Sequence, residues 1–248
     1  MRYFLGIKYI LVLFLLVSFL AANGQLRHRW EAGGGLSALG YLGDLNREGL
    51  ISREFKPALS LFLRHSVGDH LSLKANMMLG KISGQDSNYP SRASRNLSMS
   101  SPLVEGSLML EWDMFEMNPD YYRYSYNYEN AYTPYFFGGI GLAYTNPSVD
   151  FSETQTPYAY IREGISRDAV ANYSKYNVVF PLGAGIKYDL NPCAGLALEV
   201  AFRITMTDYL DGVSEAGNSR RPDAYQMVTF KYMHRLGRYR CFPFKPRR

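Results

Sequence analysis

Long hydrophobic runs are missing from most of this sequence. After residue 24, no apolar stretch reaches the roughly 20 residues that a membrane-spanning helix requires. Only helices and closed barrels satisfy all of their backbone hydrogen bonds in lipid. The chain after residue 24 is therefore expected to be either a secreted soluble protein or a β-barrel that enters a membrane by its strands, and its length fits a single domain.

A strong net charge is missing as well. The formal net charge is +5, and it falls to +3 when the two charges Arg2 and Lys8 of the leader are taken away. A balance this small does not indicate a nucleic-acid partner, and an exported protein rarely meets one. Positive side chains nevertheless gather at the end of the chain: Arg235, Arg238, Arg240, Lys245, Arg247 and Arg248. Residues 236–248 are expected to form a basic tail, either disordered or docked.

The first 24 residues have the pattern of a cleaved signal peptide. Arg2 and Lys8 form a positive start, and residues 9–20 are an apolar run of about a dozen residues, typical of a signal peptide and short for a membrane anchor. Ala22 and Gly24 supply small residues before a cleavage site. We therefore expect residues 1–24 to be removed, so that the mature chain begins at Gln25.

Alternation of apolar and polar residues is the main structural signal, because successive side chains of a strand point to opposite faces. It is strong in residues 71–80, 104–113 and 196–204, each about as long as a tilted membrane strand. Weaker alternation marks five further strands, at 30–38, 56–65, 132–144, 176–188 and 223–234. The sequence therefore predicts an all-β fold over residues 25–235, an eight-stranded antiparallel transmembrane β-barrel of the size of OmpA and OmpX barrels.

The connections between these strands alternate in length. Two are tight turns, at 67–69 and 189–192. The long connections, which are rich in turn-forming residues, are 39–55, 83–95, 146–175 and 208–222. Outer-membrane barrels have short periplasmic turns and long external loops, so both termini and the basic tail are expected in the periplasm. The connection at 114–131 departs from this pattern, because it is long and yet falls on the periplasmic side.

The inward positions of the predicted strands combine charge with glycine. The charged residues expected in the lumen are Glu31, Arg64, Lys74, Glu105, Glu111, Lys187, Glu199, Arg203 and Lys231. Charges of both signs have to pair there to offset their desolvation, and an eight-stranded barrel is just wide enough for side chains to fill. The inward glycines are Gly33, Gly35, Gly139, Gly141, Gly183 and Gly185. Because no helical pattern follows them, they indicate relief of crowding rather than a phosphate site, and we expect a plugged barrel rather than a pore.

Few side chains are placed for catalytic or metal chemistry. The four histidines are His28, His65, His70 and His234. All fall near periplasmic strand ends, whereas an enzyme acting on external lipid would need a histidine at the outer rim. His65 and His70 could face each other, but two ligands make a poor metal site. Acidic residues at 43–46 and 207–211 could bind a cation and are explained more simply as caps of loop turns. No catalytic residue, metal or cofactor is expected.

The two cysteines, Cys193 and Cys241, are both expected at the periplasmic rim. Cys193 precedes the strand at 196–204, and Cys241 follows the last strand, which runs antiparallel to it. An oxidising compartment permits a disulfide between them, and the alternative is a pair of unrelated thiols. We predict the bond.

Six short strings, in order along nearly the whole mature chain, resemble those of a known barrel family. They are Gly43-Asp44-Leu45-Asn46, Gly80-Lys81-Ile82-Ser83-Gly84, Arg95-Asn96-Leu97-Ser98, residues 133–141, residues 181–188 and Thr207-Asp208-Tyr209-Leu210-Asp211. Together they are similar to the PorG family, outer-membrane barrels of the type IX secretion system of Bacteroidota. The resemblance implies a non-enzymatic role: PorG-like proteins associate with the periplasmic ring of PorK and PorN and help to anchor it at the outer membrane. It implies ring proteins and outer-membrane lipids as partners.

Candidate docking residues come from topology and composition rather than from the resemblance. They are Tyr121, Tyr122, Arg123, Tyr124, Tyr126 and Tyr128 in the long periplasmic connection, and Arg238, Arg240, Lys245, Arg247 and Arg248 in the tail. Two other roles remain open for such a barrel. One is an adhesin or ligand-binding protein that uses its long loops, and the other is an enzyme that modifies outer-membrane lipid.

Overall fold

Eight long strands make up most of the structure, a computed structural model that describes residues 30–43, 54–88, 96–115, 132–151, 157–191, 193–216 and 223–236. The strands are β1 (Trp30–Leu42), β2 (Phe55–Ser66), β3 (Leu71–Gln85), β4 (Ser98–Asp113), β5 (Tyr132–Thr145), β7 (Tyr176–Asn191), β8 (Ala194–Thr205) and β9 (Ala224–Leu236). The shorter elements are a 3₁₀ turn η1 (Asp86–Asn88), strand β6 (Ser148–Asp150) and helix α3 (Ala159–Asp168).

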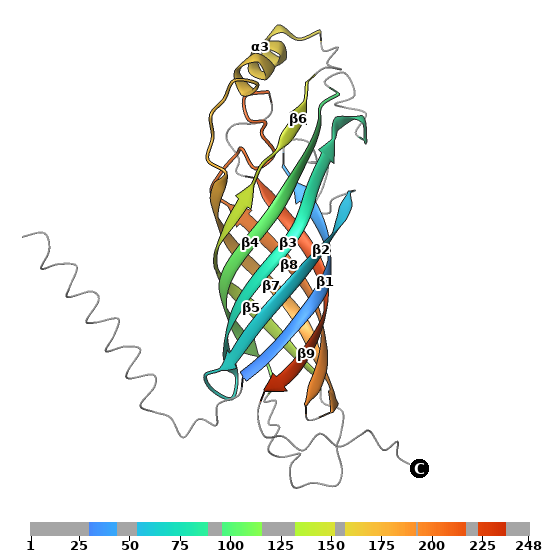
Figure 1. The fold of residues 1–248 in the computed structure, drawn as a ribbon, viewed down its shortest axis with the longest axis vertical. Coiled ribbons are helices and arrows are strands. Elements are labelled where there is room, and N and C mark those ends of the chain that lie inside the picture. The colour runs from blue at the N-terminus through green and yellow to red at the C-terminus, as the bar shows by residue number, and fades with distance from the viewer. Residues whose placement is uncertain are drawn as a thin grey trace, which may run out of the picture.

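The long strands pair antiparallel in the order β3-β2-β1-β9-β8-β7-β5-β4, and a further pairing of β3 with β4 closes the barrel (Figure 1). The first and last strands pair from Trp30 opposite Leu236 to Leu42 opposite Ala224. The start of β1 and the end of β9 therefore lie at one end, with the short β2–β3 and β7–β8 turns, which makes this the periplasmic end. The predicted all-β, eight-stranded antiparallel barrel is confirmed.

The outer surface of the barrel is apolar. Each long strand turns large hydrophobic side chains outward, and examples from the eight strands in chain order are Leu36, Leu61, Met77, Leu108, Ile140, Leu182, Val200 and Phe230. Aromatic rings lie toward the periplasmic end: Trp30, Trp112, Tyr132, Tyr188 and Tyr232. An apolar band bordered by aromatic residues is the surface that a barrel presents to lipid. The fold is thus that of an outer-membrane β-barrel rather than of a secreted soluble protein.

The interior is divided between a charged half and an apolar half. Toward the periplasmic end, the inward side chains are mostly charged. Toward the external end, the inward residues Leu39, Tyr41, Met78, Ile82 and Leu103 join one buried apolar cluster. The same strands supply both halves, so the change of chemistry occurs along each strand and fills the lumen at both levels.

Inward glycines make room for aromatic rings that cross the lumen. A Cβ added at Gly183 would lie 2.5 Å from the ring of Phe137, and one at Gly185 would lie 2.7 Å from the ring of Tyr135. Contacts this short do not occur, so a larger residue at either position would displace its ring. The interpretation of these glycines as relief of crowding is confirmed.

Several elements extend beyond their predicted limits on the external side. β3 continues to Gln85 and β4 begins at Ser98, and these extensions pair with each other, although residues 83–85 were expected in a loop and the predicted fourth strand began at 104. β6 pairs with the start of β4, and α3 forms within the connection 146–175 (Figure 1). At the other end, β9 runs to Leu236, one residue into the predicted tail. No helix in the described part of the chain is long and apolar enough to cross a membrane.

Candidate functional site

The lumen holds all nine of the charged residues predicted for it. The structure buries Glu31, Arg64, Lys74, Glu105, Glu111, Lys187, Glu199, Arg203 and Lys231 almost completely. Three further charged residues lie with them: Asp113, Asp189 and Arg235. Each member of this set forms at least one ion pair. The pairs divide into a large network near the periplasmic end and a separate pair nearer the outside.

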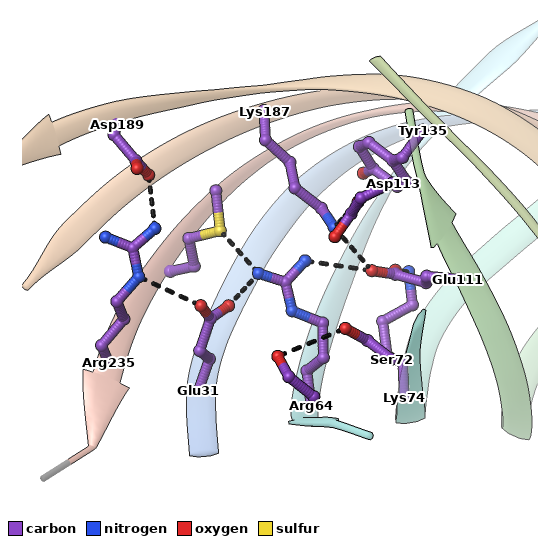
Figure 2. Close-up of polar contacts among 12 residues, drawn as sticks. Glu31, Arg64, Ser72, Lys74, Glu111, Asp113, Tyr135, Lys187, Asp189 and Arg235 are labelled. Atoms are coloured by element: carbon purple, nitrogen blue, oxygen red, sulfur yellow. Dashed lines mark hydrogen bonds and ion pairs between the residues drawn. The ribbon is translucent and has the colours of Figure 1, made fainter. Parts of the chain in front are cut away.

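Glu111 of β4 is the centre of the large network (Figure 2). Its carboxylate accepts a hydrogen bond from Arg64 Nη1 at 3.0 Å and pairs with the ammonium groups of Lys74 and Lys187, the second at 3.1 Å. Lys187 also donates to Asp113 Oδ1 at 2.5 Å. Three cations around one carboxylate leave local positive charge, which the neighbouring carboxylates compensate.

Toward the periplasmic mouth, the network continues through Glu31 of β1. One of its carboxylate oxygens pairs with Arg64, and the other accepts from Arg235 Nε at 3.1 Å. Arg235 also donates from Nη2 to Asp189 Oδ1 at 2.6 Å, so its guanidinium lies between two carboxylates (Figure 2). These residues come from β1, β2, β7 and β9, and they fill the mouth of the lumen.

Toward β8, the network continues through Glu199. It accepts from Lys74 Nζ at 3.0 Å and from Tyr135 Oη at 2.5 Å, and it pairs with Lys231 Nζ at 2.6 Å. Because Tyr135 lies on β5, every long strand contributes to the network. Its charged members are the carboxylates Glu31, Glu111, Asp113, Asp189 and Glu199 and the cations Arg64, Lys74, Lys187, Lys231 and Arg235. Five negative and five positive charges make the network neutral.

The three lysines of the network also lie over aromatic rings. Lys74 lies 4.6 Å from the centroid of Phe137, Lys187 lies 4.2 Å from that of Tyr135, and Lys231 lies 5.1 Å from that of Phe62. Such contacts stabilise a desolvated ammonium group on the faces that no carboxylate covers. The aromatic rings over the inward glycines are therefore part of the charged network.

The separate pair lies further out, where Arg203 Nε donates to Glu105 Oε2 at 3.2 Å. Tyr225 Oη donates to the same oxygen at 2.7 Å, and Ser107 Oγ donates to Oε1 at 2.7 Å. This pair is also neutral. Charge pairing therefore offsets desolvation at both levels of the lumen, as burial of ions requires.

At the external end, the β8–β9 connection folds into the mouth of the barrel. Leu210 and Val213 are fully buried in the apolar cluster. Tyr41 Oη, on β1, donates to Asp211 and, at 3.0 Å, to Asp223 Oδ1, which ties the loop to the barrel wall. The lumen is thus closed by a loop at the outside and by ion pairs at the periplasmic end.

α3 lies above this loop, at the end of the barrel far from the start of β1 (Figure 1). Asp168, its last residue, accepts hydrogen bonds from the backbone N–H groups of Ser214, Glu215 and Ala216 at 3.2, 3.1 and 2.9 Å. A carboxylate is unfavourable at a helix C-terminus, so these bonds explain why an acid is placed there. Gly164 lets the helix approach, because a Cβ there would lie 2.5 Å from Glu215 O.

Tyr173 and Tyr209 also belong to this external cap. Their rings stack, with the ring centroids 5.1 Å apart. Partial burial raises the pKa of Tyr173, with the carboxylates of Asp211 and Asp168 adding to the effect. Burial also raises the pKa of Tyr209, whose hydroxyl faces Asp168. Tyr209 Oη donates to Asp168 Oδ1 at 3.5 Å, so one phenol of the stack is tied to the end of α3.

The residues considered for a metal have other contacts. His70 Nδ1 lies 2.9 Å from Asp113 O, and the ring of His65 lies 4.5 Å from that of Trp30. In the external loop, Asp211 accepts from the N–H of Val213 at 2.8 Å, as expected for a turn cap. The described residues contain no group of three or more His, Cys, Asp or Glu side chains arranged for a metal.

Cys193 is disulfide-bonded, and Cys241 lies outside the described residues, so the pairing of these two stays a prediction. All of the candidate docking residues also lie outside the described residues: Tyr121, Tyr122, Arg123, Tyr124, Tyr126, Tyr128, Arg238, Arg240, Lys245, Arg247 and Arg248. The structure therefore adds nothing to the case for those sites.

Sequence reasoning missed four members of the network: Asp113, Tyr135, Asp189 and Arg235. Three of them occupy the end of a strand, where alternation is read with least certainty. Asp189 was expected in a turn, but β7 continues through it to Asn191. Their position along the strand could have identified them. Each lies an even number of residues from an inward residue of its own strand, and such residues share a face.

A family model described as a domain of unknown function, DUF6089, matches residues 7–239. No curated protein matches the chain. Among solved structures, the chain is similar to Neisserial surface protein A, with 10% identity, a TM-score of 0.44, and coverage of 84% of this chain and 97% of that one. It is also similar to the attachment invasion locus protein Ail of Yersinia pestis in complex with a heparin analogue (9%, TM-score 0.41, coverage 84% and 97%) and to OprG of Pseudomonas aeruginosa (13%, TM-score 0.41, coverage 84% and 96%).

Proposed function

The chain belongs to the DUF6089 family, and we propose that it is a non-enzymatic anchor in the outer membrane that holds a periplasmic assembly. The observation that carries the proposal is the neutral ion-pair network, which joins all eight long strands across the periplasmic half of the lumen. A lumen filled in this way has no path for a solute, and the barrel is braced on the side that faces the periplasm.

The partner we propose is the periplasmic ring of a type IX secretion system, formed by proteins like PorK and PorN. The support is the similarity of the six sequence strings to the PorG family, together with the expected periplasmic placement of the basic tail. Its contacts would be made by the tyrosine-rich connection at 121–128 and by the positive side chains of the tail.

Two variants test these contacts in the full-length protein in its own envelope. One replaces the five tyrosines of 121–128 with serine. The other replaces Arg238, Arg240, Lys245, Arg247 and Arg248 with glutamine and keeps Cys241, so that the predicted disulfide is preserved. We expect both variants to insert in the outer membrane and to recover less ring protein when the detergent-solubilised barrel is captured.

A matched control removes positive charge from the external face by changing Arg162, Arg167 and Lys175, which are exposed in and after α3, to glutamine. This control is expected to recover the ring as the unaltered protein does. Capture of only proteins unrelated to secretion by the unaltered barrel would refute the proposed partner. Full recovery by both test variants would refute the docking residues.

A further inference from the structure

Arg235 occupies a particular place in the fold, because it is the last but one residue of β9 and the chain continues past Leu236 for another twelve residues. When the predicted Cys193–Cys241 bond is reduced, any pull on that continuation reaches β9 at this point, and when the bond is formed the pull also reaches Cys193. Among the strands that the structure describes, β9 pairs only with β1 and β8. A strand pulled from its end separates from its neighbours one backbone pair at a time. The pairs nearest the pulled end of β9 therefore carry the load first and alone.

The contacts of Arg235 extend beyond those two neighbours. Its side chain reaches Glu31 on β1 at 3.1 Å and Asp189 on β7 at 2.6 Å. β7 does not pair with β9, so the contact with Asp189 bypasses β8. Its backbone N–H donates to Cys193 O at 2.8 Å, and Cys193 is itself disulfide-bonded. We call Glu31, Asp189, Cys193 and Arg235 the periplasmic clasp.

The clasp is buried and continuous with the rest of the network. Arg235 and Asp189 are 6% and 1% exposed, so water competes little for their bonds. A forked guanidinium bound to two carboxylates gives directional, charge-assisted hydrogen bonds that are about twice as strong as neutral ones. Through Glu31 the clasp is joined to Arg64 and from there to Glu111, on the far strands β2 and β4.

We propose that the periplasmic clasp transfers tension from the C-terminal extension into the whole barrel wall, so that the protein resists a pull from the periplasm without β9 being peeled away. The meaning of this device in the cell rests on the proposed anchoring function. Its mechanics do not, because they are a property of the barrel by itself. The two can therefore be tested separately.

The test is single-molecule force spectroscopy on the full-length protein in phosphatidylcholine bilayers, held by its C-terminus and pulled from the periplasmic side. A reductant is present, so that a bond between Cys193 and Cys241 does not carry the load past Arg235. Arg235→Met removes the charged fork of the clasp and keeps an unbranched apolar side chain, shorter than that of arginine. The matched control is Arg203→Met, which removes a buried lumen arginine from the same hairpin at its external end. Both variants are first checked for barrel formation by the shift in gel mobility on heating.

We expect Arg235→Met to lower the force of the first rupture and Arg203→Met to leave it unchanged, since Arg203 is reached only after the base of the hairpin has opened. Arg235→Lys, which keeps the charge but cannot span both carboxylates with a fork, is expected to give an intermediate force and covers the case in which Arg235→Met does not assemble. Equal first rupture forces in the unaltered protein, Arg235→Lys and Arg235→Met would overturn the proposal. So would an equal fall in Arg203→Met. The two tests can fail separately. If the force measurements give the expected order but the unaltered barrel captures no ring protein, the proposed function fails and this inference stands. If the ring is captured but the rupture forces are equal, this inference fails and the proposed function stands.

Discussion

Replacement of Glu111 by glutamine is the most direct test of how the lumen is stabilised. The change keeps the shape of the side chain and removes one of five negative charges from a sealed, neutral network. Arg64, Lys74 and Lys187 each keep a second carboxylate, so the defect is one uncompensated positive charge rather than a broken contact geometry. Removing one partner from a buried ion pair lowers the free energy of unfolding by about 3–5 kcal/mol, and we expect Glu111→Gln to fall in that range.

The second half of the test restores neutrality by a specific route. In Glu111→Gln with Lys74→Met, four charges of each sign remain, and every one of them keeps a partner, because Glu199 still pairs with Lys231. The double variant should therefore be less destabilised than the sum of the two single variants, with a coupling energy of at least about 1 kcal/mol.

Unfolding by urea in lipid vesicles, followed by tryptophan fluorescence, measures these differences. Both tryptophans of the chain, Trp30 and Trp112, lie on the outer face, so their emission reports release from lipid. Effects of the two single substitutions that simply add, to within about 0.5 kcal/mol, would show that the charges act independently and would refute the network as the stabilising unit.

Three further predictions concern single contacts. Gly185→Ala should destabilise the barrel, seen as a lower urea midpoint, because the new Cβ would displace a lumen ring, whereas Gly106→Ala, which meets nothing within 4 Å, should leave the midpoint unchanged. Asp168→Ala should raise the hydrogen-exchange rate of the amides at 214–216, which lose their acceptor, while Glu163→Ala, an exposed change in the same helix, should not. Cys193 should resist alkylation in the urea-unfolded protein until a reductant is added, and its labelling without reductant would contradict the disulfide.

Most of the barrel could be predicted from sequence because its physics is periodic. A strand with lipid on one side and a packed, polar lumen on the other has to alternate apolar and polar residues. The pattern in residues 71–80 and 104–113 therefore predicts both the strand and the face on which each side chain lies. The nine lumen charges were found by the same parity. This reasoning needs no knowledge of which strands pair, since the lumen is common to all of them.

The external end could not be predicted in this way, because the sheet there leaves the membrane and its outer face no longer has to be apolar. The start of β4, where serines stand at 98, 100 and 101, shows only weak alternation of apolar and polar residues, and the predicted strand began at Val104. The cap depends on contacts distant in sequence, such as Asp168 with the amides at 214–216. Nothing local in a lone aspartate at the end of a short helix indicates such a partner.

The chemistry of the lumen raises the question of why ten charged side chains fill the periplasmic half, when the external half holds an apolar cluster and the Glu105–Arg203 pair. Replacing a buried ion network by apolar residues is often neutral or stabilising, so stability alone does not account for it. Register does. A slip of one residue turns every inward side chain of a strand toward lipid. A lysine or arginine turned in this way costs about 2–4 kcal/mol at the bilayer midplane and less toward the interface. Because each of the eight strands supplies the network, and seven of them supply a charge, a slipped strand would both expose its own charge and leave a buried partner uncompensated. Apolar residues carry no such penalty, since they are tolerated on either face. The charged half thus specifies the pairing of the whole barrel from its periplasmic end, the same end at which a periplasmic partner would load it.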